Sequence, residues 1–189
     1  MEIDNTLLDA CILRDRKAQY RLYKVCYGFL VSICLRYTRN RDDADALLNL
    51  GFLKILNNLE KRREEVPFPL WIRRIMINSI IDEFRKNRQE KEQFRVTDFS
   101  ESHVEYDDEL INDYIRKTDP EYILRLIREL PSVSGRVFNL FAIDGYSHKE
   151  IGELLNISEG TSKWHVNFAR TRLKERLREN SKPLRAVAS

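Results

Sequence analysis

Residues 145–167 read GYSHKEIGELLNISEGTSKWHVN, and this stretch determines how the second half of the chain folds. Ser147 and Glu150 have the spacing of a capping box, which predicts the start of a short helix. Asn-Ile-Ser at 156–158 predicts a tight turn in which Ile157 points inward and Ser158 caps the next helix. That helix buries apolar residues at helical spacing: Val166, Ala169, Leu173 and Leu177. A short helix, a turn and a longer helix form the helix-turn-helix pattern, whose second helix lies in the major groove of DNA.

The first turns of this second helix carry the candidate DNA contacts. Their side chains bring hydroxyl, carboxylate, ammonium, indole, imidazole and amide groups toward base edges: Ser158, Glu159, Thr161, Lys163, Trp164, His165 and Asn167. Arg170 and Arg172 follow at positions that suit contacts with phosphates. An ordinary helical hairpin would share the capping box, so the box alone leaves both interpretations open. The turn, the spacing and six basic residues against one acid over residues 163–178 favour DNA binding.

The helices before this pattern are marked by their ends. Asp119 is the expected N-cap of a helix with Pro120 in its first turn, and Pro131 ends that helix. A second helix is expected over about 132–144. Within the short helix of the helix-turn-helix, Gly152 is expected to let a neighbouring helix approach closely.

The first half of the chain also shows helical rather than alternating spacing of its apolar residues. A wide stripe over residues 16–38 consists of Leu22, Val25, Cys26, Phe29, Leu30, Ile33 and Tyr37. In the next helix Asp42 is the expected N-cap and Asp45 lies near the first-turn amides. Its apolar face consists of Ala44, Leu47, Leu48, Phe52, Ile55, Leu56 and Leu59. Pro67 and Pro69 interrupt the pattern, and a third helix is expected over about 70–88.

This third helix is apolar around most of its circumference but keeps one polar stripe. The stripe consists of Arg74, Asn78, Asp82 and Arg85. From the spacing alone, it is either a functional surface or a solvated face that carries an Asp82–Lys86 ion pair.

The composition limits the class of protein. With 189 residues, 42% hydrophobic and 33% charged, the chain is too apolar for a disordered protein and too charged for a membrane protein. No apolar run approaches the roughly 20 residues that cross a bilayer, and no signal peptide is visible, so membrane insertion is not expected. Three cysteines without CxxC spacing indicate reduced thiols in a cytoplasmic protein.

The net charge of +3 conceals an uneven distribution. Residues 1–90 carry 17 basic and 13 acidic side chains, residues 91–118 carry 4 and 8, and residues 119–189 carry 12 and 9. We therefore expect an all-α protein with two small helical domains, 1–90 and 119–180, joined by a flexible acidic linker over 91–118.

Catalytic chemistry is not indicated by any motif. His103, His148 and His165 are scattered, and no cysteine lies at ligand spacing from them. No Ser-His-Asp set, glycine-rich phosphate loop or nucleotide fingerprint is present. We therefore expect no metal, no cofactor and no enzymatic activity.

Several of these segments resemble the extracytoplasmic-function (ECF) group of bacterial RNA polymerase sigma factors. Residues 145–163, with Ala169-Arg170 and Leu173 after them, are similar to region 4 of that family. Its region 2 is similar to DADALLN at 43–49, FLK at 52–54 and WIRRIMINSIID at 71–82. Both regions occur in the family's order and spacing, and the resemblance covers nearly the whole chain apart from the linker and the tail.

The resemblance implies a promoter-recognition subunit whose partners are the RNA polymerase core enzyme and promoter DNA. Region 4 would bind the −35 element, while region 2 would bind the clamp of the core and melt the −10 element. The −10 surface would combine the polar stripe with a loop over residues 61–70 that receives a flipped-out base on Arg62, Arg63 and Phe68. Core binding would rest on apolar contact and on Asp42, Asp43, Asp45 and Asn49. Members of this family are commonly held inactive by an anti-sigma factor, which would be a third partner.

The chain departs from the family's pattern on two helices. Ala46, Leu50 and Gly51 stand where the core-binding helix often carries acids, and Trp164 and Phe168 stand where a small polar and a basic residue are usual. The alternative function is a stand-alone helix-turn-helix repressor or activator with an N-terminal sensing or dimerisation domain. A helical adaptor that binds no DNA is a weaker alternative. Neither of them needs the polar stripe or the 61–70 loop.

Overall fold

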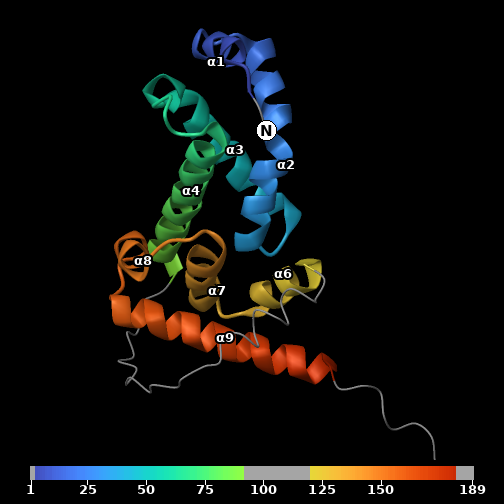
Figure 1. The fold of residues 1–189 in the computed structure, drawn as a ribbon, viewed down its shortest axis with the longest axis vertical. Helices are drawn as coiled ribbons and strands as arrows, with labels where there is room; N and C mark the ends of the chain where they lie inside the picture. Colours follow the sequence, from blue (N-terminus) through green and yellow to red (C-terminus); the bar gives the residue numbers. More distant parts are fainter. Residues whose placement is uncertain (1–2, 92–119, 182–189) are drawn as a thin grey trace, which may run out of the picture. The chain divides into compact units, whose positions relative to one another are not determined.

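The computed structural model describes residues 3–91 and 120–181, which fall into two compact units, one in each range. Every regular element in these ranges is a helix, as Figure 1 shows, so the predicted all-α class is confirmed. None of these helices combines the length and the apolar character that a membrane span requires. Asp119, residues 182–189 and all of the expected linker except Lys91 lie outside the described residues.

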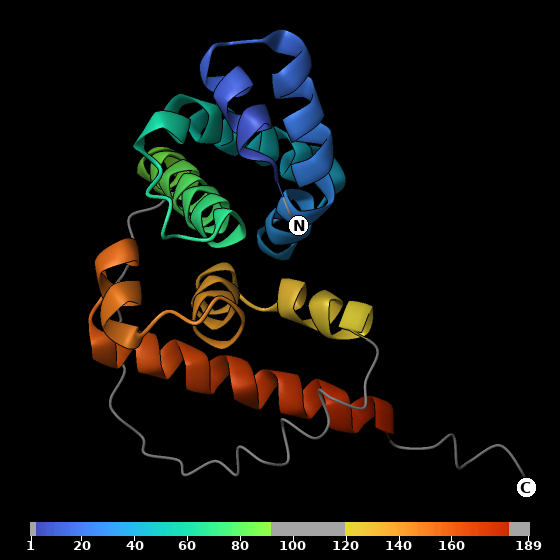
Figure 2. The ribbon, with the colours of Figure 1, turned by 45° about the horizontal axis from the view of Figure 1, so that its top comes forward.

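The helices of residues 3–91 form a bundle (Figure 2). They are α1 (Asn5–Ile12), α2 (Arg16–Tyr37), α3 (Arg41–Asn58) and α4 (Phe68–Lys91), with a 3-10 turn, η1 (Leu59–Lys61), directly after α3. α3 packs against both α2 and α4, while α1 packs against α2. The fully buried side chains at the centre include Leu22, Leu30, Ile33, Leu48, Ile55, Ile72, Met76 and Ile80. The apolar face predicted for this helix is buried at Ala44, Leu47, Leu48, Phe52 and Ile55, and α3 packs with it between its two neighbours.

The N-terminal end of α3 differs from the prediction. Asn40 is the N-cap, because its side-chain oxygen accepts the amide of Asp43 at 2.8 Å. Asp42 is exposed in the first helical turn and caps nothing. An asparagine and an aspartate two residues apart are both good N-caps, so the choice between them depends on where the preceding chain turns.

The start of α4 also differs from the prediction. The helix begins at Phe68, earlier than the expected Leu70, and therefore includes Pro69 in its first turn. Proline is accepted there because the first-turn amides have no partner within the helix. The carbonyl of Pro67 accepts the amides of Leu70 and Trp71 at 3.0 and 3.1 Å.

The buried side of α2 is displaced around the helix from the predicted stripe. Val25, expected in the stripe, is exposed, while Val31 and Cys34 are buried instead. Burial raises the pKa of the Cys26 and Cys34 thiols to about 12, so both remain protonated and act as apolar fillers. The preceding helix α1, capped by Asp4, had no counterpart among the sequence predictions.

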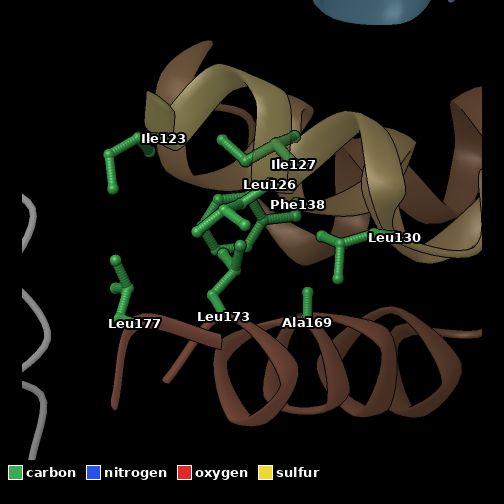
Figure 3. Close-up of a cluster of buried hydrophobic side chains, with 8 residues drawn as sticks. All are labelled: Ile123, Leu126, Ile127, Leu130, Phe138, Ala169, Leu173 and Leu177. Atoms are coloured by element: carbon green, nitrogen blue, oxygen red, sulfur yellow. The ribbon is translucent and has the colours of Figure 1, made fainter. Parts of the chain in front are cut away.

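The second unit consists of short helices that pack along one long helix (Figures 1 and 2). These are α6 (Pro120–Glu129), α7 (Ser132–Phe138), a π-helical turn η2 (Asn139–Ile143), α8 (His148–Leu155) and the long α9 (Glu159–Ser181). Figure 3 shows the core between α6, α7 and α9, formed by Ile123, Leu126, Ile127, Leu130, Phe138, Ala169, Leu173 and Leu177. The predicted helices from Pro120 and from Ser132 are confirmed, although the second ends in a π turn.

Candidate nucleic-acid interface

The second unit contains the predicted helix-turn-helix. Ser147 caps α8, because its hydroxyl accepts the amide of Glu150 at 3.2 Å while the Glu150 carboxylate accepts the amide of Ser147 at 2.8 Å. This reciprocal pair is the capping box that the sequence predicted. α8 ends at Asn156, whose φ of 54° lies in the left-handed region that asparagine tolerates.

The turn between α8 and α9 is tight because its backbone folds onto α8. The amide of Ile157 donates to the carbonyl of Gly152 at 3.1 Å. A Cβ atom at Gly152 would lie 2.8 Å from the carbonyl oxygen of Ile157, so this glycine admits the turn itself and not, as predicted, a neighbouring helix. Ser158 then caps α9 as expected, since its hydroxyl accepts the amide of Thr161 at 3.0 Å.

Two of the candidate contacts, Trp164 and Asn167, share the outward side of α9, and Lys163 stands at its flank. Val166, Ala169, Leu173 and Leu177 are buried on the inward side, as predicted. Because a helix advances by about 100° per residue, Trp164 and Asn167 lie on the opposite side, while Lys163 lies at the flank of the helix. Lys163 and Asn167 are exposed, and within the described ranges their side chains form no hydrogen bond or ion pair. Amide and ammonium groups presented in this way are able to meet base edges and phosphates.

Other candidates on α9 are engaged with the protein itself. His165 turns toward α7, where its Nδ1 lies 2.9 Å from the hydroxyl of Ser134, and burial lowers its pKa. The hydroxyls of Thr161 and Ser158 bond to each other at 2.9 Å, at the cap of the helix. The Arg170 guanidinium lies 5.9 Å from the centroid of the Phe141 ring. His165 therefore anchors α9 from behind and does not belong to the outward surface.

A second anchor was missed by sequence reasoning. Ser162 is fully buried, and its hydroxyl lies 3.0 Å from Nδ1 of His148 at the start of α8. The His148 ring stacks on Phe141 with centroids 4.3 Å apart. The signal was present in the sequence, because Ser162 stands one turn before Val166 on the apolar side of α9. Two histidine–serine pairs thus hold the helix-turn-helix together from its inner side.

In the first unit, the predicted polar stripe of α4 is partly committed to the protein. Arg74, Asn78 and Arg85 are exposed. The carboxylate of Asp82 accepts from the Lys54 ammonium of α3 at 3.0 Å, so the Asp82–Lys86 pair considered from spacing gives way to a pair between two helices. The stripe lies on the surface, but its single carboxylate already has a cationic partner.

The loop before α4 is more closed than predicted. Phe68 is only 8% exposed and packs beside Trp71, with ring centroids 5.9 Å apart. Arg62 donates to the carbonyl of Val66 at 3.2 Å, which straps the loop, while Arg63 is exposed. Phe68 thus belongs to the core and to the start of α4, and it does not face an open pocket.

The acidic start of α3 contains a hydrogen-bonded network with α2. Tyr27 donates to Asp45 at 2.9 Å and accepts from Arg41 at 2.8 Å, while Tyr23 donates to Asn49 at 3.1 Å. Asp45 is thus held by side chains and not, as predicted, near the first-turn amides of its helix. These tyrosines were not predicted as partners, since their spacing on α2 suits a core face equally well.

One exposed face of α3 mixes polar and apolar side chains. Asp42, Asn49, Leu50 and Leu53 lie along it, together with Ala46. Leu50 is 49% and Leu53 is 56% exposed, so this face keeps apolar surface that the rest of the unit does not cover. Such surface on a small unit marks a candidate site for a protein partner.

Comparison with known proteins places both units in one family. Residues 22–90 match the Sigma-70 region 2 family, and residues 121–173 match the Sigma-70, region 4 family. The RNA polymerase sigma factor SigZ of Bacillus subtilis (strain 168) is 31% identical over 133 residues, covering 70% of this chain and 72% of SigZ. The ECF RNA polymerase sigma factor SigW of the same organism is 27% identical over 157 residues, covering 79% of this chain and 83% of SigW.

Among solved structures, the chain is similar to the sigma factor RpoE of Bartonella quintana, crystallised with the anti-sigma factor NepR. The TM-score is 0.48 at 16% identity, and the alignment covers 86% of this chain and 98% of the other.

Proposed function

The chain belongs to the RNA polymerase sigma factors of the extracytoplasmic-function (ECF) type, and we propose that its two units divide the recognition of a promoter between them. A sigma factor of this type binds the core enzyme and directs the initiation of transcription at specific promoters. The observation that carries the proposal is the exposed surface of α9, where the side chains of Lys163 and Asn167 reach solvent within a helix-turn-helix.

In the second unit, α9 enters the major groove of the upstream, −35 element. Asn167 offers an amide that can bond two atoms of an adenine edge, and Lys163 offers an ammonium that suits guanine or phosphate. Arg172, further along α9, contacts the backbone. Each base contact of this kind discriminates by about 1–3 kcal/mol, so a few of them are enough to select promoters.

In the first unit, α4 faces the −10 element. Arg74, Asn78 and Arg85 are exposed along one stripe, which supports contact with an opened strand. Arg63 in the neighbouring loop adds positive charge close to the start of α4. Because Phe68 is buried, we leave it out of this surface.

The core enzyme docks on the exposed face of α3. Leu50 and Leu53 provide apolar surface, and Asp42 provides negative charge at its end. Apolar contact here takes the place of the acidic side chains that the family often carries on this helix. Binding therefore depends less on ionic strength than a purely ionic interface would.

Catalysis belongs to the core enzyme in this proposal, and the protein acts in the cytoplasm, where the polymerase meets its promoters. An anti-sigma factor is a partner expected from the family. The acidic segment 91–118, outside the described residues, would lie near the nucleic-acid channel of the polymerase. Replacing its acids with serine should then alter initiation or promoter escape in a run-off assay, and unchanged kinetics would contradict this role.

The division of work is tested by reconstituted transcription with core polymerase and a promoter library. The full chain should direct specific start sites. Lys163→Ala and Asn167→Ala should weaken binding to the upstream element by about 5- to 100-fold and leave affinity for the core unchanged. Lys174→Ala is the matched control, because it removes the same charge about 16 Å further along α9.

A substitution in the other unit completes the test. Leu53→Asp should lower affinity for the core and leave the preferred promoter sequence unchanged, and because the side chain is exposed the substitution should leave the fold intact. Loss of upstream-element selectivity in Leu53→Asp, or loss of core affinity in Asn167→Ala, would contradict the division. Tight DNA binding without the core, combined with no run-off product in its presence, would favour a stand-alone repressor.

A further inference from the structure

An aromatic pair stands on the DNA-facing helix at positions where the sequence departs from the family. Trp164 and Phe168 are one turn apart on α9, and their rings stack with centroids 5.2 Å apart and planes tilted by 20°. Trp164 lies on the outward side of the helix together with Asn167, and Lys163 lies at the flank beside them, which follows from the helical repeat. The pair therefore forms part of the same surface that is proposed to meet base edges.

Contacts at both ends hold this pair in place. The Trp164 ring meets His165 edge to face at 5.0 Å, and His165 is in turn fixed to Ser134 of α7. At the other end, the Arg172 guanidinium lies 5.6 Å from the Phe168 ring centroid and bonds to Glu175 at 3.1 Å. An indole held in this way presents a defined apolar surface with little loss of conformational freedom on binding.

The chemistry of the pair restricts what it can recognise on DNA. Phe168 has no hydrogen-bonding group, and Trp164 has a single N–H donor, so neither can make the paired hydrogen bonds that read guanine or adenine. The one apolar group that a base exposes in the major groove is the C5-methyl of thymine. Cytosine, guanine and adenine offer no such group at that position.

We propose that Trp164, supported by Phe168, is a specificity-determining residue that recognises a thymine of the upstream element through its C5-methyl group. This inference rests on the proposed function of α9 as the helix that reads the −35 element. It predicts that promoters used by this protein contain a thymine within reach of Trp164, next to the base contacted by Asn167 or Lys163.

The test replaces each thymine of the upstream element, one at a time, with deoxyuridine. This removes the methyl group and leaves the hydrogen-bonding edge unchanged. Binding of the full chain with core polymerase should fall about fourfold at one position, the factor that corresponds to burial of one methyl-sized group. In Trp164→Ala the ratio of thymine to deoxyuridine affinity at that position should return to one.

The ratio is measured within each protein, so partial unfolding of a variant cancels. Phe168→Ala should reduce the ratio, because Trp164 loses its support. Lys163→Ala should weaken both DNAs equally and keep the ratio. The proposal is wrong if no thymine position is sensitive while Lys163→Ala still weakens binding, or if the ratio persists in Trp164→Ala. If Lys163→Ala and every deoxyuridine leave binding unchanged, the proposed role of α9 fails instead.

Discussion

The two helices proposed to meet DNA differ in how their polar groups are used within the protein. On α4, Asp82 is paired with Lys54 of the neighbouring helix, and in the loop before it Arg62 holds a backbone carbonyl. On α9, the side chains of Lys163 and Asn167 make no hydrogen bond within the described residues, and the side-chain bonds of His165 and Ser162 hold the helix from its inner side.

In the second unit, the residues that hold the fold differ from the residues proposed to meet DNA. In the first unit, the same polar side chains are expected to do both. In the second unit, His165 and Ser162 anchor α9 from the inside, so outward residues can change without loss of the fold. In the first unit, the polar side chains on the surface also join helices. Substitutions there should change stability and function together, whereas substitutions on the outward side of α9 should change function alone.

The largest expected change in the free energy of unfolding comes from the tight turn of the second unit. It is tested by substituting two glycines, one in each unit, with alanine. A Cβ at Gly152 meets a backbone oxygen at 2.8 Å, whereas a Cβ at Gly51 on α3 meets the flexible end of Met76 at 2.5 Å and is in ordinary contact with the Ser79 Cβ at 3.7 Å. Both changes to alanine gain about 1 kcal/mol of helix propensity. Gly152→Ala should nevertheless be about 1–3 kcal/mol less stable than Gly51→Ala, because a backbone cannot move aside as a methionine can.

Urea unfolding of the full chain, with hydrogen exchange to assign the change to one unit, measures this difference. Exchange should accelerate in α8 and α9 for Gly152→Ala and remain normal in residues 3–91. If the two variants are equally stable, the backbone of the turn shifts to accommodate the added Cβ as easily as the Met76 side chain does.

The next prediction concerns the tyrosines between α2 and α3. Tyr27→Phe removes a donor to Asp45 at 2.9 Å in a part-buried site, and this bond should contribute about 1 kcal/mol to the free energy of unfolding. Tyr23→Phe removes a more exposed bond to Asn49 at 3.1 Å and should cost about half as much.

Chemical unfolding of both variants measures the two losses, and core-binding assays should show a change as well, because Asp45 and Asn49 are among the residues of α3 expected to bind the core. If Tyr27→Phe lowers stability without any change in core affinity, the residues that stabilise this unit are not the ones that bind the core. The first unit would then resemble the second, contrary to the difference described above.

Most of the fold could be predicted from the sequence, because the helix caps and the spacing of apolar residues agree with the burial seen in the structure. The capping box at Ser147, the apolar side of α9 and the stripe of α3 follow from spacing alone. Where two residues compete for one role, spacing was not sufficient. Asn40 rather than Asp42 caps α3, and Pro69 lies inside α4 rather than before it, because the path of the preceding chain decides both.

The site was less predictable because its partners are distant in sequence. Asp82 was considered with Lys86 on its own helix, but its partner Lys54 is on α3. The inward turn of His165 depends on Ser134 of another helix. Local spacing identifies which residues reach the surface of a helix, but it does not identify which of them a neighbouring helix will bind.

A smaller effect is expected at the ion pair between α3 and α4. The Lys54 and Asp82 side chains are 48% and 49% exposed, and a pair this exposed contributes about 0.2–1 kcal/mol. Asp82→Asn should therefore lower stability only slightly, and a double-mutant cycle with Lys54→Gln should give a coupling within that range that decreases with salt. A coupling well above it would show that the stripe of α4 is mainly structural, and its role at the −10 element would then be doubtful.

The smallest effect is a pH dependence confined to the second unit. Burial lowers the pKa of His148 and His165 below 6.5, whereas residues 1–90 contain no histidine. Below the ordinary histidine pKa, the unfolded chain binds protons that the folded unit does not, so the free energy of unfolding falls as the pH falls through that window, and near pH 7 the effect vanishes. Hydrogen exchange at about pH 7 and about pH 5 should show faster opening of α8 and α9 relative to α2 and α3 at the lower pH. Replacing both histidines with glutamine, which does not titrate, should remove that relative change, and a change that survives the replacement must come from carboxylates, not from the two anchors behind α9.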